Sequence, residues 1–219
     1  FPKSSALALM STLVDRGYLL KDPNDRYHMP SSMRARWAAD DLGQLLVAAH
    51  APMRELNERL QETVILGVLD SALQVRVLSK LTSAQEVRYD ADASVPRPAY
   101  CTAMGRVLLA FRPTQVQERY LQQAPFPKLT SASLTSATAL RKRLAHARKT
   151  GLETVFEEFS LGGSGAAVAL RNAHGEVVAA LNVATVTPRF QARQSLILQE
   201  LTHTAARISE RLGASARPV

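Results

Sequence analysis

The glycine-rich segment SLGGSGAA, residues 160–167, is the first place where residue types and spacing suggest chemistry. A nucleophile elbow requires a glycine two residues before and two residues after the serine, but Ala166 stands two residues after Ser164. A phosphate-binding loop requires a Gly-Lys-Ser/Thr sequence that opens a helix, whereas a strand-like pattern follows here. We therefore expect Ser164 to have no catalytic role.

The other reactive side chains form no catalytic or metal-binding pattern. The histidines stand far apart, without the short spacing of metal ligands; they are His28, His50, His146, His174 and His203. Cys101 is the only cysteine, which excludes an internal disulfide and a zinc site built from several cysteines. Glu157 and Glu158 are adjacent, so on a strand they would point to opposite faces. The sequence thus predicts no enzyme, no metal site and no cofactor, and favours a structural or rim position for the two glutamates.

The chain is moderately basic. Its 219 residues include 27 lysines and arginines against 19 acidic residues, a net charge of +8, which weakly favours a polyanionic partner. The densest basic run is Arg141, Lys142, Arg143, Arg148 and Lys149. Apolar residues alternate with it at helical spacing, which is more typical of the solvated face of a packed helix than of a nucleic-acid site.

No stretch approaches the roughly 18 consecutive apolar residues of a membrane span. The first residues also lack the apolar core of a signal peptide, and the single cysteine suits a reducing compartment. We expect a cytoplasmic protein that does not contact a membrane.

The first thirty residues predict a helix followed by a β-hairpin. Pro2 and the following serines favour a helix start, and apolar residues then recur at helical spacing up to Leu13. Gly17 suits the left-handed position after a helix, and YLLK and RYHM flank the turn-forming residues 22–25. This pattern indicates the back half of a winged helix-turn-helix, a partial motif whose first helices we expect to be missing. An ordinary helix and hairpin at a domain edge is the alternative.

A DNA-binding role for residues 1–30 would use the outer face of this helix and the wing. Small and polar side chains on the helix could approach the major groove, and basic side chains on the wing could meet phosphates. The candidate DNA-binding residues are Lys3, Ser4, Ser5, Ser11, Lys21 and Arg26.

A linker and a long helical pattern follow the hairpin. Pro30 breaks the chain, and a serine after it can cap a linker helix over residues 31–41. Apolar residues from Leu42 to Leu60 predict helix around Pro52, so two segments and one kinked helix both remain open. TVILGVLD and LQVRVLSK, separated by two residues, then predict a strand hairpin.

The remainder alternates helical and strand patterns. Helices are predicted over residues 102–111, 114–122, 136–149 and 187–213, and strands over LETVFEEF, SGAAVALR and EVVAALNVATV. The loop from Asp90 to Pro98 is predicted to run over the surface or across a cavity mouth. Strands in two groups with helices between them predict an α+β fold with an antiparallel sheet for residues 42–219.

The order and spacing of these motifs resemble the IclR family of bacterial transcriptional regulators. The likeness runs from PKSSALALMSTLVDRGYL and RYHM through LNERLQETVILGVLD and RPAYCTAMGRVLLA to the final strand pair and RISERLG. It implies a winged helix-turn-helix, a linker helix and a GAF-like effector-binding domain. It also implies a homodimer or homotetramer on a palindromic operator in double-stranded DNA. RPAYCTAMGRVLLA and VVAALNVA are most similar to the branch that regulates aromatic-acid and β-ketoadipate catabolism.

The resemblance also implies where a small organic acid would bind. The backbone amides of Ala103 and Met104 match those that hold an effector carboxylate. Four further pocket positions, often acidic, thiol or hydroxyl in the family, are here Val155, Gly165, Asn182 and Ala184. These side chains favour an aromatic or medium-sized acid over a very small one such as glyoxylate or pyruvate.

The sequence differs from the family pattern at Ala8, where recognition helices of the family commonly carry an arginine that could read guanine. Base contacts would fall to the serines and Lys3, and we expect this segment to bind an operator poorly. We interpret the chain as an effector-responsive, DNA-binding transcriptional regulator. The alternatives are an enzyme or small-molecule carrier built on the same α+β domain, and a regulator that acts only through protein contacts.

Overall fold

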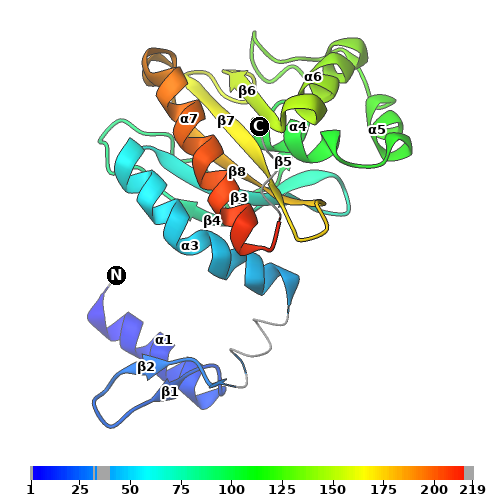
Figure 1. The fold of residues 1–219 in the computed structure, drawn as a ribbon. Coiled ribbons are helices and arrows are strands. Elements are labelled where there is room, and N and C mark those ends of the chain that lie inside the picture. The colour runs from blue at the N-terminus through cyan, green and yellow to red at the C-terminus, as the bar shows by residue number, and fades with distance from the viewer. Residues whose placement is uncertain (1, 32, 34–39, 215–219) are drawn as a thin grey trace. The chain divides into compact units, whose positions relative to one another are not determined.

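The computed structural model describes residues 2–31, 33 and 40–214 (Figure 1). The chain divides into two compact units, residues 1–47 and 48–219, and each is described by itself. The predicted linker helix, residues 31–41, falls mainly on residues outside those described.

The described residues of the first unit begin with a helix and a hairpin, as the sequence predicts. These elements are α1 (Lys3–Asp15), β1 (Leu20–Lys21) and β2 (Tyr27–His28), with the two strands antiparallel. Gly17 has φ 73°, which confirms the left-handed turn predicted after the helix. The Asp22 carboxylate accepts hydrogen bonds from the backbone amides of Asn24 and Arg26, and these bonds close the turn between the strands.

The second unit is built on a six-stranded sheet in the order β5-β4-β3-β8-β7-β6, in which every neighbouring pair is antiparallel. In chain order the strands are β3 (Thr63–Leu69), β4 (Gln74–Leu81), β5 (Arg97–Pro98), β6 (Leu152–Phe156), β7 (Gly163–Arg171) and β8 (Val177–Val186). The hairpins β3-β4 and β7-β8 join where β3 pairs with β8. The predicted antiparallel sheet is confirmed.

Helices cover both faces of this sheet. They are α3 (Asp41–Leu60), α4 (Ala103–Ala110), α5 (Thr114–Leu121), α6 (Ala137–Thr150) and α7 (Thr187–Arg211). α7 packs against β7 and β8, and α4 packs on the other face against β3, β6, β7 and β8 (Figure 1). The α+β architecture is thereby confirmed, and α3 runs as one helix with Pro52 inside it. Within the described residues, no helix is long and apolar enough to cross a membrane.

The ends of α6 follow from local sequence. The Ser136 hydroxyl caps the first turn by accepting from the amide of Ala139, and Gly151 adopts the left-handed conformation after the last turn. Leu140 and Leu144 are buried, whereas Arg141 on the outer face pairs with Glu118 of α5. The basic side of this helix is therefore a solvated, ion-paired face, as its pattern predicts.

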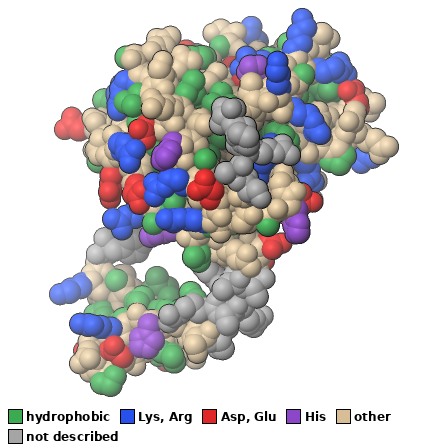
Figure 2. All heavy atoms as spheres, in the orientation of Figure 1, with side chains coloured by type: hydrophobic (Ala, Val, Ile, Leu, Met, Phe, Trp, Pro, Cys, Tyr) green, Lys and Arg blue, Asp and Glu red, His purple; other side chains and the backbone are tan. Residues whose placement is uncertain are grey.

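Charged pairs also join α3 to α7. Figure 2 shows acidic and basic side chains alternating over these two helices, where Arg59 pairs with Glu200 and Arg207 with Glu55. Each of these exposed pairs contributes little to stability. The apolar faces beneath them, which include Leu56 and Ile197, supply the packing.

Two sequence predictions need correction. The strand predicted over LETVFEEF ends at Phe156, because Glu157 has φ 55° and the left-handed conformation interrupts the pleat. The segment from Asp90 to Pro98, predicted as a loop, ends in the short edge strand β5. Pro98 suits that edge position because it has no N–H to offer a further strand, and it favours an extended Arg97 before it.

Candidate functional site

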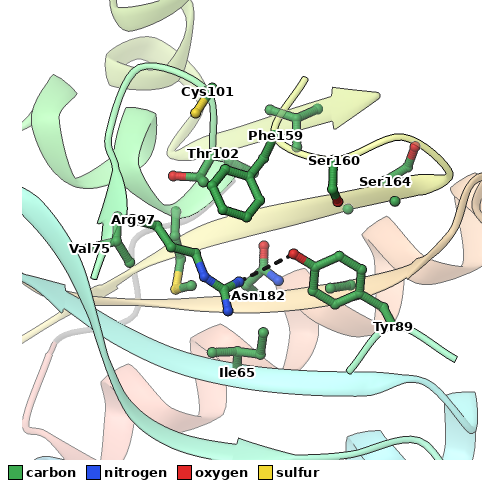
Figure 3. A pocket seen from close by; sticks show the side chains of 16 residues that line it. Ile65, Val75, Tyr89, Arg97, Cys101, Thr102, Phe159, Ser160, Ser164 and Asn182 are labelled. Carbon is green, nitrogen blue, oxygen red and sulfur yellow. Dashed lines mark hydrogen bonds between the residues drawn. The ribbon is translucent and has the colours of Figure 1, made fainter. Parts of the chain in front are cut away.

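A pocket lies between the sheet and the N-terminus of α4 (Figure 3). It contains about 490 Å³ of space, and this figure includes the part open to solvent. All six residues predicted to bind an effector line it, namely Ala103, Met104, Val155, Gly165, Asn182 and Ala184.

Strand register brings the sheet residues of this group together. Val155 on β6 is paired with Gly165 on β7, which is paired in turn with Ala184 on β8, so the three lie side by side across the sheet. Asn182 is two residues before Ala184 and therefore shares its face of the sheet. Ile65 on β3 is paired with Asn182 and extends the same wall.

The N-terminus of α4 contributes hydrogen-bond donors. The Thr102 hydroxyl caps the helix by accepting from the amide of Gly105 at 3.2 Å, and its carbonyl accepts from the amide of Arg106. Among the hydrogen bonds of the described residues, none uses the amides of Ala103 or Met104. Free amides in the first turn of a helix favour an anion, because they carry its positive dipole end.

Arg97 is a charged pocket residue that the sequence pattern does not predict. Its side chain is buried, with 5% exposed, and its Nη1 and Nη2 donate to the Tyr89 hydroxyl at 3.2 Å and the Asp92 carbonyl at 2.7 Å. The guanidinium also lies 5.3 Å from the centre of the Phe159 ring. Neither hydrogen-bond partner is charged, and no aspartate or glutamate is among the described residues lining the pocket. The pocket therefore presents a positive charge to its contents.

A sequence signal for Arg97 existed, although it was weak. This residue stands between Pro96 and Pro98, directly before the motif that opens α4. A residue before proline favours extended backbone, which allowed a strand here rather than a free loop. Nothing local in the sequence indicates that β4 would pair with this segment and turn its side chain inward.

A buried ion pair fixes α4 to the segment after β6. The Arg106 side chain has no exposed surface; its Nη1 donates to Glu158 Oε1 at 2.9 Å and its Nη2 to Glu158 Oε2. Its Nε donates to the Tyr100 carbonyl at 2.7 Å. Because Phe159 and Ser160 follow Glu158 and line the pocket, this pair positions one of its walls. Glu158 thus has the structural role that the sequence favoured.

Two pocket residues with reactive side chains are not arranged for catalysis. The Ser164 hydroxyl lies 2.8 Å from the Thr187 hydroxyl rather than beside a base. Burial raises the pKa of the Cys101 thiol to about 12, so the thiol stays neutral at physiological pH. Within the described residues, no group of three or more histidine, cysteine, aspartate or glutamate side chains could hold a metal ion.

The neutral state of Cys101 makes labelling of the native protein slow. At pH 8 the raised pKa leaves about a thousandfold less thiolate than an unperturbed cysteine would have. We expect a disulfide-exchange reagent such as dithionitrobenzoate to react at least about 100-fold more slowly with the folded protein than with the protein in urea. Equal rates in the two states would show that the thiol is accessible and ionised.

The candidate DNA-binding residues lie in the first unit and are all exposed. Lys3, Ser4, Ser5 and Ser11 are on α1, Lys21 is on β1, and Arg26 follows the turn of the hairpin. Lys21 Nζ lies 2.7 Å from the Asp25 carboxylate, and this hydrogen bond raises the pKa of Lys21. The structure therefore leaves these six side chains accessible, with one of the two wing cations paired internally.

Residues 41–210 match the family described as bacterial transcriptional regulator IclR C-terminal. KdgR of Escherichia coli K12, an HTH-type transcriptional regulator, is 29% identical over 218 residues, 96% of this chain and 81% of KdgR. The crystal structure of the C-terminal domain of E. coli KdgR is 30% identical with a TM-score of 0.68, and the match covers 78% of this chain and 99% of that domain.

A second similar protein shares the fold. An IclR homologue from Microbacterium hydrocarbonoxydans, crystallised in complex with 4-hydroxybenzoate, has a TM-score of 0.74 at 24% identity, with 98% of this chain and 88% of that chain covered. KdgR and the Microbacterium protein are named as members of a regulator family rather than as enzymes, in agreement with the predicted class. The chain belongs to the IclR family of bacterial transcriptional regulators.

Proposed function

We propose that this protein is a DNA-binding transcriptional regulator whose operator binding is controlled by a small organic acid. The observation that carries the proposal is the pocket beneath α4, which combines the buried cation of Arg97 and two free helix amides with no acidic lining residue. A cation and oriented amides bind a carboxylate. The acid would occupy this pocket in a domain of the GAF-like type.

The acid is aromatic or medium-sized. Ile65, Val75, Val155 and Phe159 give the pocket apolar walls that a two- or three-carbon acid would leave uncovered. The Microbacterium homologue crystallised with 4-hydroxybenzoate supports this choice, as does the similarity of RPAYCTAMGRVLLA to the aromatic-acid branch of the family. Ala103 and Met104 would hold the carboxylate through their backbone amides.

The DNA-binding part is assigned to residues 1–30, the linker to residues 31–41 and the effector domain to residues 42–219. α1 would enter the major groove as part of a winged helix-turn-helix, and the basic side chains of the hairpin would meet phosphates. The contacts are proposed for Lys3, Ser4, Ser5, Ser11, Lys21 and Arg26. A homodimer or homotetramer on a palindromic operator would couple the two sites, with the acid favouring one arrangement of the DNA-binding parts over another.

The test measures DNA binding and acid binding together. Genomic footprinting with the protein should identify a palindromic site, which we expect to be bound weakly because Ala8 offers no side chain that can read guanine. Fluorescence anisotropy should then give its Kd with and without 4-hydroxybenzoate, benzoate, hexanoate, pyruvate and glyoxylate. We expect an aromatic or medium-sized acid to change the Kd by about 5- to 150-fold. A palindrome that no acid affects would contradict the control by an effector, and a response to glyoxylate or pyruvate alone would contradict the size of the acid.

A further inference from the structure

We infer that Arg97 binds a second acidic group of the effector, so that the pocket selects an organic acid with two carboxylates. The inference rests on the proposed function, because it assumes that a first carboxylate lies at the amides of Ala103 and Met104. Under this inference, Arg97 distinguishes a dicarboxylic acid from the monocarboxylic acid that has the same carbon skeleton.

The hydrogen bonds of Arg97 leave most of its capacity free. A guanidinium has five N–H donors, and within the described residues Arg97 uses two, one to Tyr89 and one to the backbone at Asp92. Both acceptors are neutral, since the Asp92 carboxylate is turned to the amide and hydroxyl of Ser94. The remaining donors belong to a side chain that is 5% exposed and lines the pocket. A planar fork of this kind is suited to a carboxylate.

The two anion-binding groups occupy different places in the pocket. Figure 3 shows Thr102, which caps α4, near the top of the cluster with Cys101, whereas the guanidinium of Arg97 reaches toward Tyr89 and Asn182. A carboxylate at the amides of α4 would neutralise the end of that helix and leave the guanidinium without a directly bonded anion, because the Asp92 carboxylate acts on Arg97 only through space. A buried cation is stabilised by a directly bonded anion, so a second carboxylate on the effector completes the charge balance.

The neighbours of Arg97 favour this role over a purely structural one. The Tyr89 hydroxyl accepts from Arg97 and retains its own proton, which it can donate to a bound carboxylate. The amide of Asn182 is a further neutral donor in the same wall. The Phe159 ring lies against the guanidinium and holds its plane without using any of its donors. The site is therefore rich in donors, and no acidic side chain is among the described residues that line it.

The experiment compares matched acids by isothermal titration calorimetry. Benzoate and benzene-1,4-dicarboxylate share a ring, and hexanoate and hexanedioate share a chain, so each pair differs only in the second carboxylate. For the unaltered protein we expect the better-fitting diacid to bind about 10- to 100-fold more tightly than its monoacid. In Arg97→Gln that diacid should fall to the affinity of the monoacid, while the monoacid itself changes by less than about threefold.

Two further variants separate charge from position. Arg97→Lys keeps the charge but not the planar fork, so it should retain part of the diacid preference. Arg88→Gln removes a cation from the same segment; Arg88 is exposed, pairs with Asp90 and is outside the pocket lining, so all affinities should be unchanged. Thermal unfolding without acid shows whether each variant is folded. If Arg97→Gln does not fold, the ratio of the diacid and monoacid affinities of the unaltered protein still tests the inference.

Three results would overturn the inference, and they are distinguishable. Equal affinity for monoacid and diacid in the unaltered protein would show that Arg97 selects no second carboxylate. Equal weakening of both acids in Arg97→Gln would show that Arg97 holds the only carboxylate. Both of these leave the proposed function standing. If none of the four acids binds the unaltered protein, the proposed organic-acid control fails together with the inference.

Discussion

Replacement of Glu158 by glutamine is expected to lower the free energy of unfolding by about 3–5 kcal/mol. Arg106 has no exposed surface, and the Glu158 carboxylate, whose side chain is 13% exposed, is its charged partner. Glutamine is nearly the same size but neutral, so the variant leaves a buried cation without a counter-charge. Urea unfolding followed by circular dichroism would measure the loss. A change below about 1 kcal/mol would show that water or another group compensates the cation.

A double-mutant cycle identifies the source of that loss. If the unpaired charge is responsible, removal of both charges in Arg106→Met/Glu158→Leu should be less damaging than Glu158→Gln alone, because apolar replacements of buried ion pairs are often tolerated. The double variant still leaves the Tyr100 carbonyl without the donor that Arg106 provides, which costs about 1–3 kcal/mol. A double variant as unstable as the sum of its single variants would instead indicate two independent packing defects.

The same substitution should also weaken acid binding if the pocket is the effector site. Thr130 and Ser133 donate to the carbonyls of Glu157 and Glu158, so this segment is held by its backbone as well as by Arg106. Loss of the ion pair would leave these backbone hydrogen bonds intact but would loosen the side of the segment that lies nearest to α4. Phe159 follows directly and contacts Arg97, which makes the pocket wall sensitive to the change.

The elements of the second unit were predictable where the signals are local. Ser136 begins α6 by capping its first turn, and Gly151 ends it in a left-handed turn. Both signals are visible in the sequence. The hairpin of β7 and β8 was predictable for the same reason, because Asn172 accepts from the amides of His174 and Glu176 in the expected turn. Such features depend on residues within a few positions of each other.

The pocket was predictable only in part. Asn182 and Ala184 share a face by the alternation of a strand, but their alignment with Val155 and Gly165 depends on the register between strands. The family resemblance supplied that alignment. Neither the strand alternation nor the family resemblance indicated Arg97 or Tyr89. Both residues come from a segment whose position is set by contacts with residues distant in the sequence. Thr63 donates to the Tyr89 carbonyl, for example, across 26 positions.

Gly105→Ala is the second substitution expected to have a large effect, a loss of about 3 kcal/mol in the free energy of unfolding. A methyl group at this position would lie 2.3 Å from Ala99 Cα and 2.6 Å from the Ala99 carbonyl oxygen. It would also lie 2.7 Å from the Thr102 hydroxyl that caps α4. The first two atoms are backbone, so relief requires a shift of the whole segment that carries Arg97 and Pro98 rather than a rotamer change.

The sign of this effect separates packing from helix propensity. Within a helix, alanine is about 1 kcal/mol more favourable than glycine, so propensity alone predicts a more stable Gly105→Ala variant. Gly67→Ala, on strand β3, shows the effect of a softer contact, because its methyl group would meet the flexible end of Met104 at 2.8 Å and the Arg76 carbonyl at 3.1 Å. We expect it to cost less, about 1 kcal/mol. A Gly105→Ala variant at least as stable as the unaltered protein would show that α4 can move away from residues 97–102.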